Sequence, residues 1–156
     1  MGAAMFYHLT RTPAEGLVPT LIGKSQSAGW RIELRGTDAD RMARLDEHLW
    51  QGDGFMAHGI AGGPHDARQP VLLTVAGGDG KTAPEAATND PQCVIAVDGA
   101  AVEAAECDRL ARVCILFDGN DEAAVTHARA QWRALTGAGV AAEYWSEGGG
   151  KWERKA

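Results

Sequence analysis

Three stretches of the chain are apolar at almost every position. They are Pro70 to Val75 (PVLLTV), Gln92 to Gly99 (QCVIAVDG) and Arg112 to Gly119 (RVCILFDG). Strands of this composition are covered on both faces, as in parallel sheets whose crossover helices pack on each side. The pattern therefore predicts an α/β protein: a three-layer sandwich with a mostly parallel (mixed) central sheet and Rossmann-like topology.

Three further segments are predicted to complete this sheet. Met5 to Thr10 forms a first strand, and Gly29 to Gly36 forms a second strand that is bounded by glycines. Val140 to Ser146 follows a glycine-rich stop, and we expect it to lie at an edge of the sheet. Strands thus alternate with helical segments along the chain, which is the order that a parallel sheet requires.

The segment after the first strand carries signals for a helix start. Thr12 is placed to cap the helix, Pro13 suits its first turn, and Glu15 can return a hydrogen bond to the cap. Pro19 interrupts the pattern. We expect Pro19 either to kink this helix or to mark its true start.

Two more helices follow from apolar residues at helical spacing. One spans Asp38 to Trp50, and the other runs from Asn120 to the Gly137–Gly139 stop, with Asp121 and Glu122 suited to its positive end. Their apolar stripes are Met42, Leu45 and Leu49 in the first and Val125, Ala128, Trp132 and Leu135 in the second.

The segment from Leu45 to Gly63 fits neither periodicity once its helix has ended. It is rich in glycine, yet it carries Trp50, Phe55 and Met56. Two interpretations remain open: these large apolar side chains plug into the core of their own domain, or they form a surface for another protein.

Length and composition indicate one domain spanning residues 1–156. The chain is 45% hydrophobic and 23% charged, which is typical of a globular protein with a single core. No run approaches the roughly 18 apolar residues of a membrane span, and the first residues lack the basic start of a signal peptide. We therefore expect a cytoplasmic protein without a membrane contact.

The charge balance argues against a surface that broadly binds nucleic acid. The net charge is −6, whereas phosphate binding depends on clustered Lys and Arg. The charge is unevenly placed, however, because residues 129–156 hold five basic and three acidic side chains. This distribution predicts a small basic patch on an acidic body.

The turn from Gly77 to Thr82 (GGDGKT) resembles a phosphate-binding loop. Such a loop needs a glycine five residues before its Gly-Lys pair, where this chain has Val75. The following segment contains Pro84 and Pro91 and lacks the apolar stripe of a helix that would face a phosphate. A nucleotide- or phosphate-binding enzyme that uses this turn is therefore an alternative, and a simple turn is favoured.

Other chemistry has little support in the sequence. No G-x-S-x-G motif is present, so acyl transfer has no candidate nucleophile, and no cofactor motif follows a strand. Histidines and aspartates in the middle of the chain match no zinc spacing, and the cysteines lack a C-x-x-C pair, so inert roles are favoured. These residues are His48, His58, His65, Asp46 and Asp66, and Cys93, Cys107 and Cys114.

The last helix carries the clearest signal for recognition. Arg129 and Arg133 stand one turn apart, beside Trp132. The simple interpretation is a core stripe flanked by solvated arginines. The alternative is that the two guanidinium groups receive a carboxylate, while the indole forms one wall of an apolar pocket.

Several motifs occur in the order found in one protein family. They are FYHL, LDEHLW, GFMAHGIAGG, QPVLLT and ARAQWRALTGAG. With these motifs the chain resembles the chi subunit of bacterial DNA polymerase III holoenzyme along almost its whole length. The resemblance implies a three-layer α/β protein without catalytic activity, which links the clamp loader to single-stranded-DNA-binding protein.

The resemblance also implies two binding sites. The acidic tail of single-stranded-DNA-binding protein, which ends in a Phe with a free carboxylate, would bind at the matching positions. These are Arg129, Trp132 and Arg133, with Phe117 and Asp118 at the preceding strand end. The chain departs from the family at Asp118, where an apolar residue is expected, and at Thr136, where a basic one is. Lys151, Arg154 or Lys155 are available to compensate.

The second site would contact the psi subunit, the small protein that bridges to the clamp loader. Trp50, Phe55 and Met56 lie in the matching segment. A third possibility is direct binding of single-stranded DNA, in which Trp132, Trp145 and Trp152 stack on bases beside the basic residues near the end of the sequence. The acidic balance disfavours it.

Overall fold

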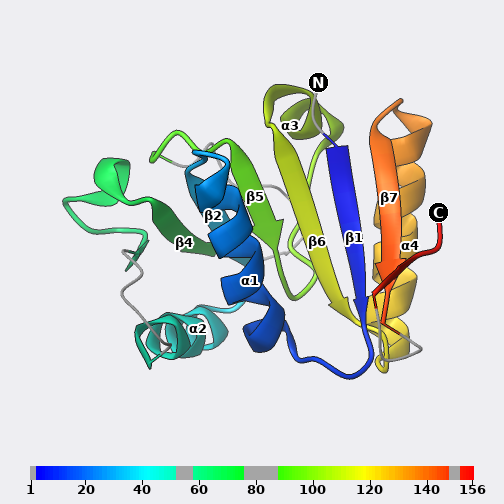
Figure 1. Ribbon diagram of the computed structural model, residues 1–156, viewed down its shortest axis with the longest axis horizontal. Coiled ribbons are helices and arrows are strands. Elements are labelled where there is room, and N and C mark those ends of the chain that lie inside the picture. Colours follow the sequence, from blue (N-terminus) through cyan, green and yellow to red (C-terminus); the bar gives the residue numbers. More distant parts are fainter. Residues whose placement is uncertain (1–2, 52–57, 76–87, 148–151) are drawn as a thin grey trace.

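The computed structural model describes residues 3–51, 58–75, 88–147 and 152–156. They build one eight-stranded sheet with helices on both faces (Figure 1). The strands are β1 (Ala3–Leu9), β2 (Ile32–Gly36), β3 (Gly59–Ile60), β4 (Val71–Val75), β5 (Cys93–Ala96), β6 (Arg112–Asp118), β7 (Ala141–Ser146) and β8 (Glu153–Arg154). The helices are α1 (Ala14–Ser27), α2 (Ala39–Gln51), α3 (Ala104–Arg109) and α4 (Glu122–Gly137), with a 3₁₀ turn at Asp66–Arg68.

The strand order is β3-β4-β2-β5-β6-β1-β7-β8. Every described pair is parallel except β7 with β8, which is antiparallel. This mixed, mostly parallel sheet confirms the fold class that the apolar runs predicted.

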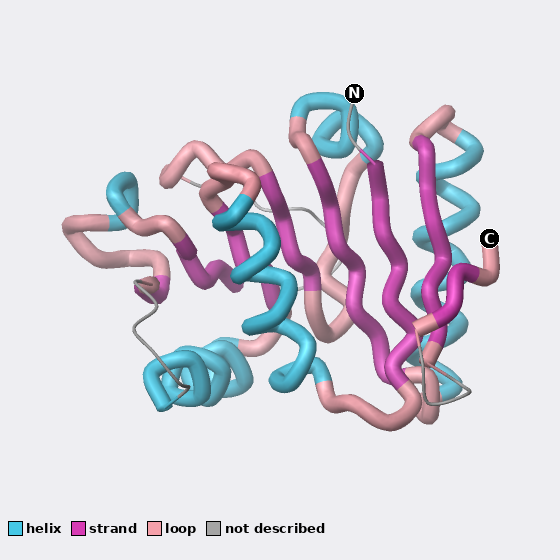
Figure 2. Tube along the Cα trace, viewed as in Figure 1, coloured by secondary structure: helices cyan, strands magenta, loops and turns pink. Residues whose placement is uncertain are grey.

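The sheet separates two hydrophobic cores, with α1 and α2 on one face and α3 and α4 on the other (Figure 2). Alternation along the strands assigns side chains to the two faces. Ile32 and Leu34 of β2 join the α1 and α2 side, whereas Phe6 of β1 joins the α3 and α4 side. The predicted stripe of α4 is confirmed: Ala128 and Leu135 are buried, and Val125 and Trp132 pack against the same core.

The predicted start of the first helix was partly wrong. The helix begins at Ala14, so Pro13 is its N-cap, and no side chain caps it. Thr12 instead donates its hydroxyl to the carboxylate of Glu147, at 2.8 Å. Pro19 lies inside the helix and does not mark its start.

Two other predictions need correction. The last helix begins at Glu122 rather than at Asn120, because the carboxylate of Asp121 accepts the N–H groups of Ala123 and Ala124 as an N-cap. In the described part of the chain, the strand predicted to lie at the edge, β7, is covered by β8. The short elements α3, β3 and β8 were not predicted, since each is too brief to carry a periodic pattern.

Candidate functional site

A pocket of about 430 Å³ lies between α4 and β7 and is lined by both predicted arginines. Its lining consists of Arg129, Trp132, Arg133, Tyr144 and Ala156. We call it the arginine pocket. Arg129 and Arg133 are exposed on successive turns of α4, so their guanidinium groups face the same space.

Aromatic packing holds the wall of the arginine pocket in place. Trp132 is half-buried and meets the rings of Phe6 and Tyr144 edge-on, with centroids 5.2 and 5.9 Å apart. The hydroxyl of Tyr144 lies 2.6 Å from Nδ1 of His8, at hydrogen-bond distance. Burial raises the pKa of Tyr144 above its ordinary value of 10.0. One side of the indole is thus fixed to the core while the other lines the pocket.

The guanidinium groups of the arginine pocket have N–H donors that are available to a ligand. Among the described residues, no carboxylate lies within ion-pair distance of Arg129 or Arg133. Nε of Arg133 donates only a long bond, 3.4 Å, to the backbone oxygen of Arg129. Because a guanidinium has five N–H donors in a planar fork, the pair is able to bind a carboxylate bidentately.

The other residues predicted for the tail site, Phe117, Asp118 and Thr136, do not line this pocket. Phe117 is buried, and its ring centroid lies 6.0 Å from that of Tyr144, behind the pocket wall. Thr136 donates its hydroxyl to the backbone oxygen of Trp132, at 2.7 Å. Asp118 is exposed at the end of β6, accepts the N–H of Asn120 and lines a different cavity.

The basic residues expected to compensate are engaged elsewhere or not described. Arg154 pairs with Glu143 at 3.4 Å, and Lys155 pairs with Glu153 at 2.9 Å. Lys151 lies outside the described residues. Sequence reasoning missed Tyr144 and Ala156; the aromatic residue on the predicted last strand was the one available signal, because a strand following α4 in a parallel sheet packs beside it.

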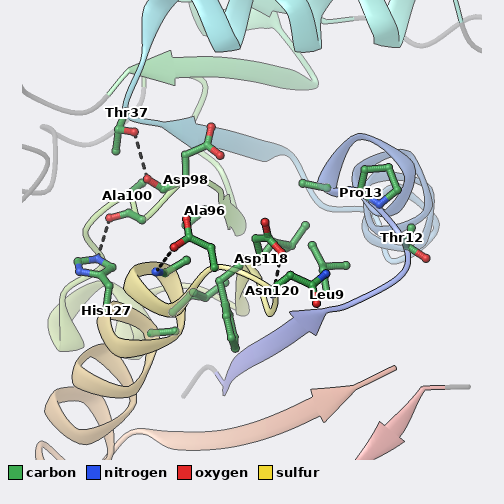
Figure 3. Close-up of a pocket in the computed structure, with 18 of the residues that line it drawn as sticks. Leu9, Thr12, Pro13, Thr37, Ala96, Asp98, Ala100, Asp118, Asn120 and His127 are labelled. Carbon is green, nitrogen blue, oxygen red and sulfur yellow. Dashed lines mark hydrogen bonds between the residues drawn. The ribbon is translucent and has the colours of Figure 1, made fainter. Parts of the chain in front are cut away.

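A larger cavity of about 840 Å³ opens at the carboxyl ends of β1, β5 and β6 (Figure 3). We call it the carboxyl-edge cavity. The neighbouring strands β1 and β6 lead into α1 and α4, which pack on opposite faces of the sheet, so their loops diverge here. This is the switch point at which open α/β sheets hold ligands.

The turn that follows β1 at the carboxyl-edge cavity already binds a carboxylate of the same chain. The N–H groups of Thr10, Arg11 and Thr12 donate to Oε1 of Glu147 over 3.0, 2.8 and 2.7 Å. Burial alone would raise the pKa of this carboxyl, but the hydrogen bonds outweigh it and the pKa is lowered. Dinucleotide-binding folds place a phosphate at this turn. Here the position is filled by a carboxylate.

The charge of the residues that line the same cavity also disfavours a phosphate. Four carboxylates line it against two guanidinium groups, and one of these, Arg41, pairs with both Glu15 and Asp98. The lining acids are Glu15, Asp98, Asp118 and Asp121, and the bases are Arg11 and Arg41. The predicted alternative site, Gly77 to Thr82, lies outside the described residues.

A second arginine group is sealed inside the domain, on the α3 side of the sheet. Arg35 is 1% exposed, and Nε and Nη2 donate to Glu33 at 2.9 and 3.0 Å. Nη1 donates to Glu106 at 2.8 Å and to the backbone oxygen of Ala101 at 2.9 Å. Burial raises the pKa of Glu106. All three guanidinium nitrogens donate, and the side chain is sealed from solvent, so this network joins β2 to α3 and is not accessible to a ligand.

The opposite end of the sheet exposes large apolar side chains. Trp50, Ile60 and Val75 are 52%, 42% and 40% exposed. They come from α2, β3 and β4, which contact one another. We call this surface the tryptophan face; Phe55 and Met56 lie outside the described residues. The question left open by the sequence is answered for Trp50, which lies at the surface and not in the core.

Histidines and cysteines are potential metal ligands, and His58 and the three cysteines have well-defined surroundings. Nε2 of His58 lies 3.1 Å from a carboxylate oxygen of Asp46, and its ring packs against Trp50, with centroids 4.2 Å apart. In the described ranges, no three His, Cys, Asp or Glu side chains gather as metal ligands. All three cysteines are buried and free, and burial raises the pKa of Cys107 to about 11.

Comparison with known proteins adds one family. The model of the family described as DNA polymerase III chi subunit, HolC, matches residues 1–143. No curated protein matches the chain. Of the helices that the structure describes, none has both the length and the apolar character needed to span a membrane.

Proposed function

The chain belongs to the DNA polymerase III chi subunit family, and from this premise we propose that its arginine pocket binds the acidic C-terminal tail of single-stranded-DNA-binding protein. Membership supports an accessory role in DNA replication. Binding of the tail in the arginine pocket and the link to the clamp loader go beyond family membership, and they are what we propose.

One observation carries the proposal: two guanidinium groups and one half-buried indole line the same pocket. A peptide end that carries an aromatic side chain beside its carboxylate needs both partners. The carboxylate pairs with Arg129 and Arg133, and the side chain packs against Trp132 and Tyr144. Because the body of the protein is acidic, a confined basic site favours a short acidic peptide over a DNA backbone.

The tryptophan face is the proposed site for the psi subunit or an equivalent clamp-loader component. An exposed Trp and two exposed aliphatic residues on elements that contact one another have the composition of an interface centre. The face belongs to the β3 and β4 end of the sheet, whereas the arginine pocket belongs to the β7 end (Figure 1). Both partners therefore have room to bind at once, as an adaptor requires.

Titration with a synthetic tail peptide tests the first site. Arg129→Ala should weaken binding by about 1.5 to 3 kcal/mol, or roughly tenfold or more, since it removes a charged hydrogen-bond partner. Arg44→Ala is the matched control, because Arg44 is exposed on α2, away from the pocket lining. Equal affinities for the wild type and Arg129→Ala would exclude the pocket as the tail site.

Binding of purified psi subunit tests the second site. Trp50→Ala should lower its affinity by about 2 kcal/mol or more, as expected for an interface hot spot. Gln51→Ala, the exposed neighbour, is the control and should bind normally. Unchanged binding by Trp50→Ala would show that psi contacts another surface.

Direct binding of single-stranded DNA is less well supported. Trp132 packs against the core on the α4 side, whereas Trp152 packs with Tyr7 against the core on the α1 side. Indoles on opposite faces of a sheet cannot stack on successive bases of one strand. Tight binding of an oligonucleotide without any peptide, with steep salt dependence, would restore this alternative.

A further inference from the structure

Residues 152–156 run along the outer edge of β7, and we call them the strap. Trp152 anchors the strap by meeting the ring of Tyr7 edge-on, with centroids 5.5 Å apart. Beyond it, β8 pairs antiparallel with β7, Arg154 opposite Trp145. The N–H of Lys155 donates to the oxygen of Tyr144 at 2.7 Å, and the N–H of Tyr144 donates to the oxygen of Ala156 at 3.3 Å. The strap thus completes the sheet at this edge.

The strap leads directly into the arginine pocket. Ala156, its last residue, is one of the five residues that line the pocket, together with Tyr144 of β7. An extended chain that runs antiparallel to β7 therefore brings its later residues to Arg129 and Arg133. This path has the direction that would deliver the C-terminal end of a peptide to the two guanidinium groups.

The strap is more weakly held than the longer strands of the sheet. Its strand is two residues long, and residues 153–156 are all exposed. It has two ion pairs, Arg154 with Glu143 and Lys155 with Glu153, in which every side chain except the partly buried Glu143 is solvent-exposed, and such pairs contribute little. The family match ends at residue 143, so the strap lies beyond the part of the chain that the family model covers.

We propose that an acidic partner peptide docks on β7 as an added strand, in the place of the strap and in the same direction. The peptide then makes the backbone hydrogen bonds that the strap makes with Tyr144, and its last residue enters the arginine pocket. This inference rests on the proposed function, because it takes the arginine pocket as the peptide site.

The two parts of this surface supply different kinds of recognition. Backbone bonds along a sheet edge bind any extended chain, as in other cases of strand addition. The guanidinium groups add a requirement for negative charge at the C-terminal end of the peptide, and Trp132 adds an apolar wall. While the strap is bound it occupies the edge and one wall of the pocket, so it competes with the partner peptide.

Peptide titration of two strap variants tests this inference. The probe is a short synthetic acidic peptide that ends in Phe with a free carboxylate. A chain that lacks residues 152–156 should bind it about 5-fold more tightly or better, the factor for two ordinary hydrogen bonds that no longer need to be broken. Trp152→Ala releases the anchor and keeps every charge, so it should shift affinity in the same direction.

Backbone hydrogen exchange on the wild-type chain provides a test that needs no altered protein. Saturation with the peptide should speed exchange at the N–H of Lys155, which loses its bond to Tyr144, while the N–H of Tyr144 stays protected. Slower exchange at Lys155 means that the peptide binds over the strap, and this result overturns the inference.

The possible outcomes separate the two proposals. Affinity that is unchanged or lower in both strap variants overturns the displacement of the strap but leaves the arginine pocket as the peptide site. If the wild-type chain does not bind the peptide, or if Arg129→Ala binds it equally well, the proposed function itself fails and the inference falls with it.

Discussion

The domain places two arginine groups on the same side of its sheet and uses them in opposite ways. Arg35 is sealed in the core, and each of its guanidinium nitrogens donates to Glu33, Glu106 or a backbone oxygen. Arg129 and Arg133 are exposed, and no described carboxylate pairs with them. A buried arginine whose guanidinium nitrogens all donate within the protein joins structural elements, whereas an exposed pair beside a fixed indole is accessible to a ligand.

The two arginine groups differ in how much stability the protein should lose when each is removed. Loss of Arg35 would leave two buried carboxylates, Glu33 and Glu106, without their cation. Loss of Arg129 or Arg133 leaves only solvated surface behind. Stability and peptide binding should therefore respond to different arginines.

The largest expected effect is on stability, from Arg35→Ala. Breaking a buried ion pair by removing one partner costs about 3 to 5 kcal/mol, which is a large part of the stability of a domain of this size. Urea unfolding measures the loss, and Arg44→Ala on α2 is the exposed control. A loss below 1 kcal/mol would mean that the Arg35 network contributes little to holding β2 and α3 together.

The next largest effect is on binding, from Arg133→Ala. The acidic tail peptide should bind more weakly by about 1.5 to 3 kcal/mol, while urea stability stays within 0.5 kcal/mol of the wild type. Amidation of the peptide's end removes the partner charge. When the amidated peptide is tested on Arg133→Ala, the amidation should cause little further loss of affinity, because both changes delete the same contact. Additive losses would place the carboxylate elsewhere.

The sequence predicted the layers of the fold and the grouping of three residues that line the arginine pocket, because both depend on local patterns. Continuous apolar runs identified the buried strands, and helical spacing placed Arg129 and Arg133 beside Trp132. Polar residues within a strand gave no such signal. Arg35 and Glu33 were part of a predicted strand, but their partner Glu106 lies on α3, which has only six residues and no recognisable period.

Contacts between distant parts of the chain could not be predicted. Glu147 meets the N–H of Thr12 across 135 residues of sequence, and no local pattern specifies that pair. The same holds for the strap, whose pairing with β7 decides which residue forms the last wall of the arginine pocket. The exposure of Trp50 depends on where α2 ends relative to β3, which is also a tertiary property.

Glu147 is an intermediate case, since it is a buried anion held by its own chain. Glu147→Ala leaves the N–H groups of residues 10–12 without their acceptor and should cost about 1 to 3 kcal/mol of stability. Urea unfolding at neutral pH measures this loss. Stability equal to that of the wild type would mean that water replaces the carboxylate fully.

The pH dependence sharpens this prediction. The pKa of Glu147 is lowered from its ordinary value of 4.5, so between the two values the unfolded chain binds the extra proton. Its contribution is fully present above pH 4.5 and is lost as the pH falls through the folded-state pKa. The difference in stability between wild type and Glu147→Gln should therefore shrink on acidification below about 4.5. A constant difference would exclude a charged Glu147 as the cause.

The smallest expected effect comes from Arg154, which completes the comparison because it is paired, like Arg35, yet exposed, like Arg129. It lies 3.4 Å from Glu143, with 59% of its side chain exposed. Water screens such a pair, so Arg154→Ala should change stability by about 0.5 kcal/mol or less, as measured by urea unfolding. A loss as large as that of Arg35→Ala would mean that pairing, and not burial, decides which arginine is structural. A small loss assigns that role to burial, and leaves the exposed arginines of the β7 end, Arg129 and Arg133, available for a partner.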